Sequence, residues 1–143
     1  MVLVDTTVWV DFFSNSRVPH VAALESLLVG RDSICICGIV LTEVLQGIRS
    51  DEQYGRAKKY FDALIFLPMT RATFVRAAEI YRSLRRRNIT VRKPLDCMIA
   101  AVAIEHHVPL LHNDRDFIPI EKHCGLKVVH PTDHIGRKTQ PES

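Results

Sequence analysis

The sequence lacks any apolar run long enough to cross a membrane. Its longest uninterrupted apolar stretch is the eight residues Cys97–Ile104, whereas a membrane-spanning helix needs about 18 or more. The N-terminus also lacks the basic segment of a secretory signal, and Asp5 and Asp11 interrupt the apolar core that such a signal requires. These absences predict a protein without a membrane segment that resides in the cytoplasm.

Internal repeats and low-complexity segments are also missing, and cysteines are few. With 143 residues, 47% of them hydrophobic and 24% charged, the chain matches one globular domain and not a disordered segment. The four cysteines are expected to be free, buried thiols, because the cytosol is reducing and a domain of this size needs no disulfide. The net charge of +3 permits a nucleic-acid partner without requiring one.

Short apolar segments alternate with segments of helical periodicity. We predict strands at residues 2–4, 33–37, 65–67, 108–111 and 127–129. We predict helices at residues 8–13, 21–29, 38–48, 51–63, 70–87 and 94–106. This alternation indicates an α/β domain over residues 1–130, with a mainly parallel central sheet flanked by helices. Residues 131–143 have little apolar surface to bury, and a flexible C-terminal tail is expected there.

The longest predicted helix, residues 70–87, shows one apolar stripe at helical spacing. We expect that stripe to face the core, and its members are Phe74, Ala77, Ala78, Tyr81 and Leu84.

Acidic residues gather where strands end and where helices begin. Asp5 follows the first strand, and Asp114 and Asp116 follow the strand at 108–111. Asp96 lies in the first turn of the helix that Pro94 opens, and Glu43 lies inside an otherwise apolar helix. Each acid alone has a structural explanation, such as a helix cap, a turn or the rim of an apolar face. Ligands bind beyond the carboxyl ends of the strands in parallel sheets, so one shared site explains the five acids together.

A shared acidic site implies a cation. Converging carboxylates repel one another, so something positive must hold them together. Oxygen ligands of this kind select hard divalent ions such as Mg²⁺ or Mn²⁺ and not zinc. A carboxylate-bound Mg²⁺ keeps positions open for phosphate oxygens and activates water at neutral pH. The pattern therefore predicts metal-dependent hydrolysis of phosphodiesters.

Four segments in order resemble the motifs of PIN-domain ribonucleases, and of their VapC-type toxins in particular. The segments are Val2–Phe12, Leu41–Ile48, Pro94–Ala101 and Leu110–Phe117. The likeness covers residues 1–130 in order, spacing and length. It implies a single PIN-like domain and an endoribonuclease that cleaves RNA with one or two Mg²⁺ or Mn²⁺ ions.

The resemblance also implies roles for individual acids. Asp5, Glu43, Asp96 and Asp114 match the acidic quartet of the family. Asp5 and Asp96 are expected to hold the principal metal. Glu43 and Asp114 are expected to ligate through waters or to orient the nucleophile.

Three further positions complete the predicted site. Asp116 matches an additional acid near a second metal position, and Thr6 matches a hydroxyl residue that steadies the first Asp. His112 departs from the pattern, because many relatives carry Thr or Ser there. A hydroxyl contact at this position is therefore lost or replaced by an imidazole.

A basic segment precedes the third motif. Arg85, Arg86 and Arg87 end the long helix, and Arg92 and Lys93 come just before Asp96. Arg115 lies between two of the acids. These six residues are candidates for RNA backbone contacts. The alternatives are a solvated helix C-terminus, where cations are favoured anyway, and, for Arg115, a structural counter-ion.

The resemblance further implies a homodimer and a VapB-type antitoxin that places a segment in the acidic site. Two alternatives remain open at this point. The first is a non-catalytic PIN-like module that binds RNA or protein. The second is a DNA nuclease on the same fold.

Overall fold

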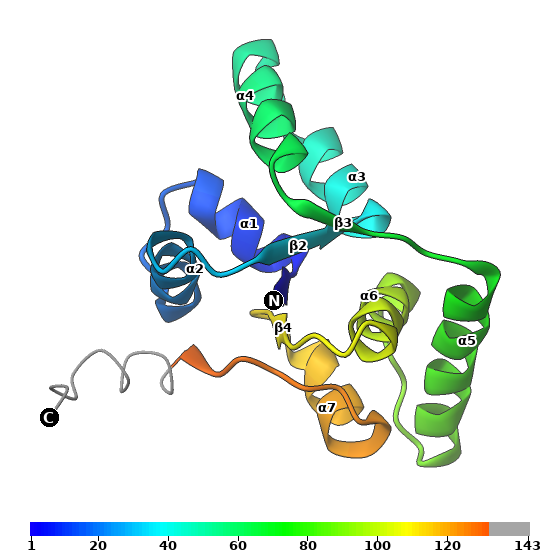
Figure 1. Cartoon of the computed structure of the whole chain (residues 1–143). Coiled ribbons are helices and arrows are strands. Elements are labelled where there is room, and N and C mark those ends of the chain that lie inside the picture. The colour runs from blue at the N-terminus through cyan, green and yellow to red at the C-terminus, as the bar shows by residue number, and fades with distance from the viewer. Residues whose placement is uncertain (132–143) are drawn as a thin grey trace, which may run out of the picture.

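Four parallel strands form the centre of the computed structural model, which describes residues 1–131 (Figure 1). The strands are β1 (Val2–Val4), β2 (Ile34–Cys37), β3 (Ile65–Leu67) and β4 (Leu110–Leu111), in the order β3-β2-β1-β4. The central strands β2 and β1 and the edge strand β4 are buried throughout, because both faces of the sheet are covered. The predicted α/β class with a parallel sheet is confirmed.

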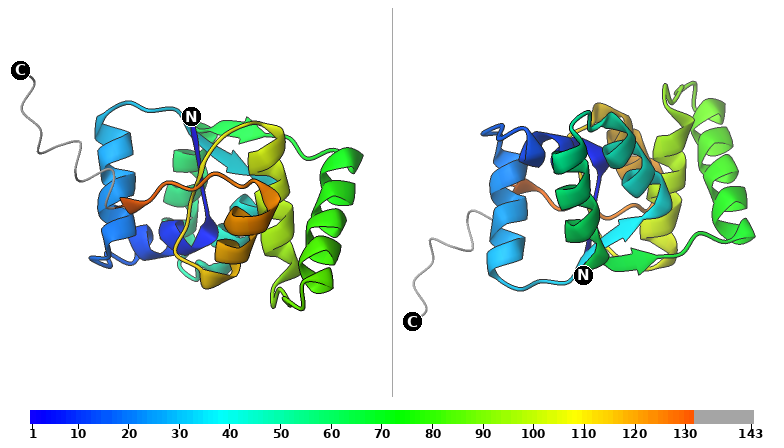
Figure 2. Two further views of the ribbon diagram at one scale, coloured as in Figure 1. Left: turned by 90° about the horizontal axis from the view of Figure 1, so that it is seen from below. Right: turned by 90° about the horizontal axis from the view of Figure 1, so that it is seen from above.

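Helices cover the sheet from both sides, as Figures 1 and 2 show together. The helices are α1 (Thr6–Phe13), α2 (Pro19–Val29), α3 (Gly38–Gly47), α4 (Asp51–Asp62), α5 (Arg71–Arg86), α6 (Pro94–Glu105) and α7 (Ile118–Cys124), with a 3₁₀ turn η1 (Arg115–Phe117) before α7. The pair α1 and α2 lies on one side of the sheet, and α6 and α7 lie on the other. Helix α5 is peripheral and packs against α6.

An aromatic cluster joins α1 to α4. The Trp9 ring is fully buried, and its centroid lies 5.1 Å from that of Phe61. Phe12, Phe13 and Tyr60 surround the same ring at centroid distances of 5.8, 6.0 and 5.9 Å. The Trp9–Phe13 pair is stacked and the other three pairs are edge-to-face, and both arrangements add to the free energy gained by burial. The cluster therefore fixes α1, which directly follows Asp5.

The segment after β4 differs from its prediction. The strand expected at 127–129 is a single bridge between Val128 and Leu110. This bridge consists of two hydrogen bonds, from the Leu110 N–H to the Lys127 carbonyl and from the Val129 N–H to the Leu110 carbonyl. Two elements, η1 and α7, were not predicted, and α7 ends at Gly125 in the left-handed conformation with φ of 79°.

The core-facing stripe of α5 also differs from its prediction. Ala77 and Leu84 are buried as expected, but Phe74 and Ala78 are exposed and Tyr81 is half-buried. Thr73 and Ile80 are buried in their place. A polar residue therefore occupies a core position that hydropathy alone assigns to its neighbour.

Two other predictions concern the cysteines and the tail. All four cysteines are free, and Cys35, Cys37 and Cys97 are buried whereas Cys124 is half-buried. The predicted tail lies outside the described residues except for Pro131, so the boundary at residue 130 stays a prediction. None of the helices within residues 1–131 is both long and apolar enough to cross a membrane.

Candidate functional site

The carboxyl end of β1 delivers the first acid of the site. Asp5 is only 2% exposed, and its backbone N–H donates to the Leu111 carbonyl of β4 at 2.9 Å. Its side chain caps α1, where Oδ2 accepts hydrogen bonds from the Thr7 N–H at 3.1 Å and the Thr7 hydroxyl at 2.6 Å. Burial raises the pKa of Asp5, although these hydrogen bonds oppose the shift.

The hydroxyl that steadies Asp5 belongs to Thr7 and not to the predicted Thr6. Thr7 Oγ1 also accepts the Asn113 N–H at 3.1 Å, so it links the start of α1 to the segment after β4. Thr6 instead donates to Glu43 Oε1 at 3.0 Å and brings the α3 carboxylate to the same place. Both threonines therefore position acids, but the Thr6 hydroxyl contacts Glu43 and not Asp5, which Thr6 contacts through its backbone N–H.

The N-terminus of α6 supplies Asp96. Pro94 occupies the first helical position, and the Asp96 N–H donates to the Lys93 carbonyl at 3.0 Å. Asp96 is 6% exposed, and its buried Oδ2 has no hydrogen-bond partner within residues 1–131. Burial, and then the charges of Asp5 and Asp114, raise the pKa of Asp96 to about 7.

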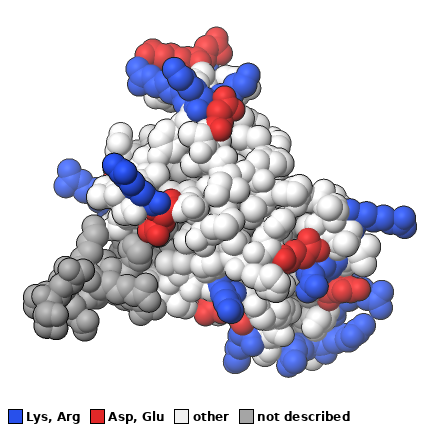
Figure 3. All heavy atoms as spheres, viewed as in Figure 1, with Lys and Arg blue, Asp and Glu red and all other residues white. Residues whose placement is uncertain are grey.

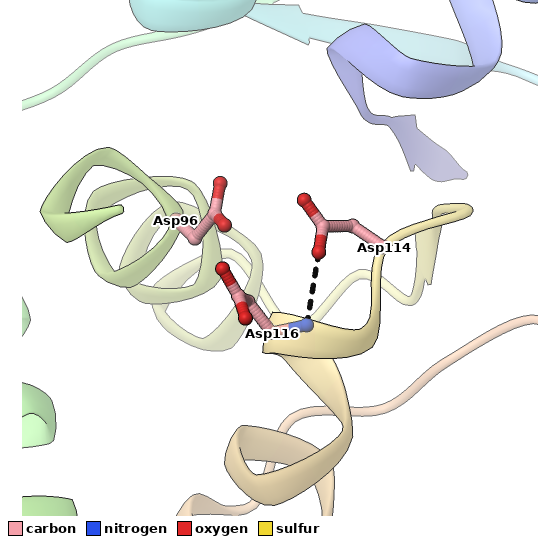
Figure 4. Close-up of side chains that lie close together, drawn as sticks. All are labelled: Asp96, Asp114 and Asp116. Carbon is pink, nitrogen blue, oxygen red and sulfur yellow. Dashed lines mark hydrogen bonds between the residues drawn. The ribbon is translucent and has the colours of Figure 1, made fainter. Parts of the chain in front are cut away.

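Two acids follow β4 and face Asp96. Oxygen atoms of Asp96, Asp114 and Asp116 all lie within 4.8 Å of one another, and Figure 4 shows their carboxyl groups directed toward a common space. Asp114 caps η1, because its Oδ1 accepts the Asp116 N–H at 2.9 Å. Asp96, in the first turn of α6, and Asp114 and Asp116, which follow β4, therefore lie close together, as the sequence predicted.

Lys93 provides the counter-charge of this group. Its Nζ lies 2.8 Å from Asp114 Oδ2, and Asp114 is the less exposed partner. Burial acts to raise the pKa of Asp114, but the hydrogen bonds from Lys93 and the Asp116 N–H prevail and lower it. The hydrogen bond to Asp114 in turn raises the pKa of Lys93. Lys93 therefore lies inside the acidic group and not only beside it.

An open cavity of about 380 Å³ brings the quartet together. Its lining is Asp5, Thr6, Thr7, Val10, Asp11, Glu43, Lys93, Asp96, Asn113 and Asp114. Sequence reasoning missed Thr7, Asp11 and Asn113 as members of the site. Only their positions in the sequence could have indicated these three residues. Thr7 lies two residues after Asp5, which caps α1, and Asp11 lies one helical turn after Thr7. Asn113 directly precedes Asp114.

The imidazole of His112 contacts the turn that carries Asp114. Its Nδ1 accepts the Asp114 N–H at 3.1 Å, and its ring lies 4.8 Å from the Phe117 ring. Burial, with a smaller effect of His20, lowers the pKa of His112 to about 4, so the ring is neutral at pH 7. His112 thus shapes the turn that presents Asp114.

The residues present fit a hard divalent cation. Carboxylate oxygens of Asp96, Asp114 and Asp116 lie within 4.8 Å of one another, close enough to bind one cation. The buried Asp96 Oδ2 has no hydrogen-bond partner among the described residues. Sulfur and imidazole ligands do not join this group within residues 1–131. Such an oxygen-only set suits Mg²⁺ or Mn²⁺ chemistry on phosphate esters.

The five predicted arginines, unlike Lys93, are not among the residues that line the acidic cavity. Arg85 and Arg86 lie in the last turn of α5, and Lys122 and His123 lie in the last turn of α7, which packs on α5. Figure 3 shows Lys and Arg side chains gathered where α5 ends and α7 lies. Of the six predicted cations, only Lys93 lines the acidic cavity.

The chain is similar to known proteins in sequence and in fold. A family model described as "PIN domain" matches residues 2–122. The chain is 33% identical to ribonuclease VapC11 of Mycobacterium tuberculosis over 131 residues, which is 90% of this chain and 98% of that protein. It is 36% identical to ribonuclease VapC21 of the same species over 106 residues, covering 72% of this chain and 76% of that protein.

Solved structures share the fold. One is VapBC2 from Rickettsia felis bound to a promoter DNA fragment, with a TM-score of 0.71, 20% identity and coverage of 90% of this chain and 98% of that one. Another is a toxin–antitoxin complex from Klebsiella pneumoniae, with a TM-score of 0.69, 22% identity and coverage of 92% and 98%.

Proposed function

Because this chain belongs to the PIN domain family, as its four motifs predicted, and within it to the VapC ribonucleases, we propose that it is the toxin ribonuclease of a toxin–antitoxin pair. Its reaction is the hydrolysis of RNA phosphodiester bonds with Mg²⁺ or Mn²⁺. The observation that supports the chemistry most directly is the convergence of carboxylate oxygens of Asp96, Asp114 and Asp116 within 4.8 Å of one another, together with a buried Asp96 Oδ2 that lacks a partner among residues 1–131.

The contacts of each side chain indicate its role in the proposed reaction. Asp96, Asp114 and Asp116 would each supply one carboxylate oxygen to the cation, and Asp5, which lines the same cavity, would add a fourth carboxylate. A divalent cation held there would supply polarisation of the phosphate and a more acidic water. Glu43, which the Thr6 hydroxyl holds at 3.0 Å, orients that water for attack.

The proposed attack is in line on the phosphorus of the RNA backbone. The water oxygen forms a new bond to phosphorus, and the bond to the leaving oxygen breaks. The bond that breaks is the one from phosphorus to the 3′ oxygen, which takes up a proton as it leaves, so one product carries a 5′-phosphate and the other a 3′-hydroxyl. The carboxylates stay close together through the step because β1, β4 and α6 hold their backbones in the core.

Partners follow from the same membership. We propose a VapB-type antitoxin as the inhibitor, since solved neighbours of this fold include complexes titled VapBC. We further propose a homodimer that acts in the cytoplasm. Arg85, Arg86, Arg87, Arg92 and Arg115 are exposed and provide the cations along which the RNA backbone approaches.

Incubation of purified protein with RNA tests the function. Structured and single-stranded RNAs are offered with Mg²⁺, with Mn²⁺ and with EDTA. The variants D5N and D96N are compared with D62N, which removes an exposed carboxylate of α4 outside the cavity. We expect metal-dependent cleavage that D5N and D96N lower by at least about 100-fold and that D62N retains.

The other results separate the rival functions. Cleavage by folded D5N and D96N at the parental rate contradicts the assignment of the acidic site. Equal cleavage of DNA lacking the 2′-hydroxyl identifies a DNA nuclease on the same fold. A parent that binds Mn²⁺ and RNA but cleaves no nucleic acid is a binding module.

A further inference from the structure

The charge of the acidic cavity creates a problem for an anionic substrate. Five of its lining residues are carboxylic acids, namely Asp5, Asp11, Glu43, Asp96 and Asp114. Among the lining residues, all of which fall within the described range 1–131, Lys93 is the one Lys or Arg. A phosphodiester carries a negative charge, so a cavity of this composition repels it unless cations face it.

The backbone fixes Lys93 relative to Asp96. Lys93 is the residue before the first turn of α6, its carbonyl accepts the Asp96 N–H at 3.0 Å, and Pro94 restricts the peptide between them. Any substrate that contacts Asp96 or its ligand therefore comes within reach of the Lys93 side chain.

The ammonium lies at the boundary between the buried acids and solvent. The Lys93 side chain is 60% exposed, whereas the Asp114 side chain that it contacts at 2.8 Å is 13% exposed. A lysine ammonium has three N–H donors. Asp114 is the acceptor found for it within residues 1–131, so two donors remain for another acceptor.

We propose that Lys93 is a phosphate-binding residue of the reaction: its ammonium bridges Asp114 Oδ2 and a non-bridging oxygen of the scissile phosphodiester. The proposal rests on the proposed ribonuclease function and deepens it. It separates Lys93 from the arginines of α5, which lie outside the cavity and contact backbone phosphates elsewhere. It also distinguishes Lys93 from a mere structural counter-ion, which would contact Asp114 alone.

The same geometry has a consequence for the cation. The Lys93 ammonium and a metal ion compete for Asp114 Oδ2, because both are drawn to the same carboxylate oxygen. Removal of the ammonium therefore leaves the affinity for Mn²⁺ alone unchanged or increases it. By contrast, the removal of a residue that only builds the metal site lowers the affinity for Mn²⁺.

Three variants test the proposal. K93M removes the charge and keeps most of the side-chain volume, and K93R keeps the charge. K58M removes one exposed cation of α4 outside the cavity lining and serves as the matched control. Thermal melting establishes that each variant is folded. Free Mn²⁺ is titrated by electron paramagnetic resonance without RNA, and RNA cleavage is measured at saturating Mn²⁺.

For K93M we expect Mn²⁺ affinity equal to or above that of the parent, and kcat/KM for RNA lower by at least about 10-fold. K93R is expected to stay within about fivefold of the parent, and K58M to match it. Unchanged cleavage by K93M overturns the proposal. It is also overturned if K93M merely needs more Mn²⁺ and then reaches the parental rate.

A failure of the proposed function gives a different result. In that case the parent binds Mn²⁺ but cleaves no RNA. The Lys93 contact is then measured from binding of a fluorescein-labelled single-stranded RNA to the Mn²⁺-loaded protein. Weaker binding by K93M than by K93R and K58M supports the contact, and equal binding by all four proteins rejects it.

Discussion

At the scale of single residues, Asp96 combines properties that are costly for stability. It is 6% exposed, its Oδ2 has no partner among the described residues, and other carboxylates lie within 4.8 Å. A buried carboxylate without hydrogen bonds strongly disfavours its charged form. The fold therefore carries this cost in the absence of a cation, and the proposed metal site explains why the residue is acidic.

The raised pKa of Asp96 predicts a specific dependence of stability on pH. The ordinary pKa is 3.8 and the folded value is about 7, so the folded protein binds the proton more tightly than the unfolded chain does. The destabilisation by Asp96 is therefore absent below about pH 4, grows as the pH rises, and is complete above about pH 7. Substitution by Asn removes it.

We therefore expect D96N to melt at a higher temperature than the metal-free parent, by roughly 2–5 °C at pH 8 and by less at pH 5. Melting curves in EDTA between pH 5 and pH 8 measure the difference, with D62N as the control that shows no trend. A difference that is constant across this range, or that shrinks as the pH rises, contradicts the assigned cause.

The acids of the site were predictable from sequence, whereas their partners were not. Asp5, Asp96 and Asp114 follow or begin elements whose periodicity is plain, so parallel-sheet geometry gathers them. Thr6 and Thr7 are adjacent and chemically identical, and only the turn of α1 decides which one faces Asp5. Lys93 and Asp114 are 21 positions apart, and no local pattern links them.

At the scale of elements, the same reasoning explains the orientation of α5. Apolar residues predicted a stripe through Phe74 and Ala78, but the helix buries Thr73 and Ile80. Burial of Thr73 is possible because its hydroxyl donates to Glu105 Oε2 of α6 at 2.7 Å and accepts the Thr70 N–H at 2.9 Å. A hydropathy pattern does not reveal a polar residue whose partner lies on another helix.

This contact yields a prediction for the α5–α6 pair. T73V keeps the volume of the side chain but removes the hydrogen bonds to Glu105 Oε2 and from the Thr70 N–H, while Glu105 Oε1 keeps its ion pair with Arg76. We expect a loss of about 1–3 kcal/mol in the free energy of unfolding, with unchanged Mn²⁺ binding by the folded variant. Urea titration measures the loss, and T73S, which restores the hydroxyl, serves as the control. A T73V protein as stable as the parent contradicts the role of the hydroxyl.

At the scale of the whole molecule, opposite charges occupy different places. Carboxylates line the cavity at the end of β1 and β4, whereas Arg85, Arg86 and Arg87 lie at the end of α5. Arg85 lies over the Tyr81 ring at 5.8 Å, and the ion pairs found within residues 1–131 do not involve these three arginines. Although the net charge is only +3, the end of α5 thus carries a basic surface, which we propose contacts the RNA backbone.

The arginine surface predicts how RNA binding responds to salt. Each phosphate contact to single-stranded RNA contributes about 0.7 to the slope of log affinity against log salt concentration. Replacement of Arg85, Arg86 and Arg87 by Gln is therefore expected to weaken RNA binding and to reduce that slope by up to about 2. Binding is measured by fluorescence anisotropy between 50 and 300 mM KCl, roughly the range over which such contacts respond.

A matched triple variant carries Gln in place of Arg56, Lys58 and Lys59 on α4, and it is expected to keep the parental slope. Mn²⁺ binding stays unchanged in both triple variants, because none of the six cations lines the acidic cavity. Equal slopes for the two variants would show that RNA responds to net charge alone. A lower slope for the α5 variant only would place the RNA backbone beside the end of α5.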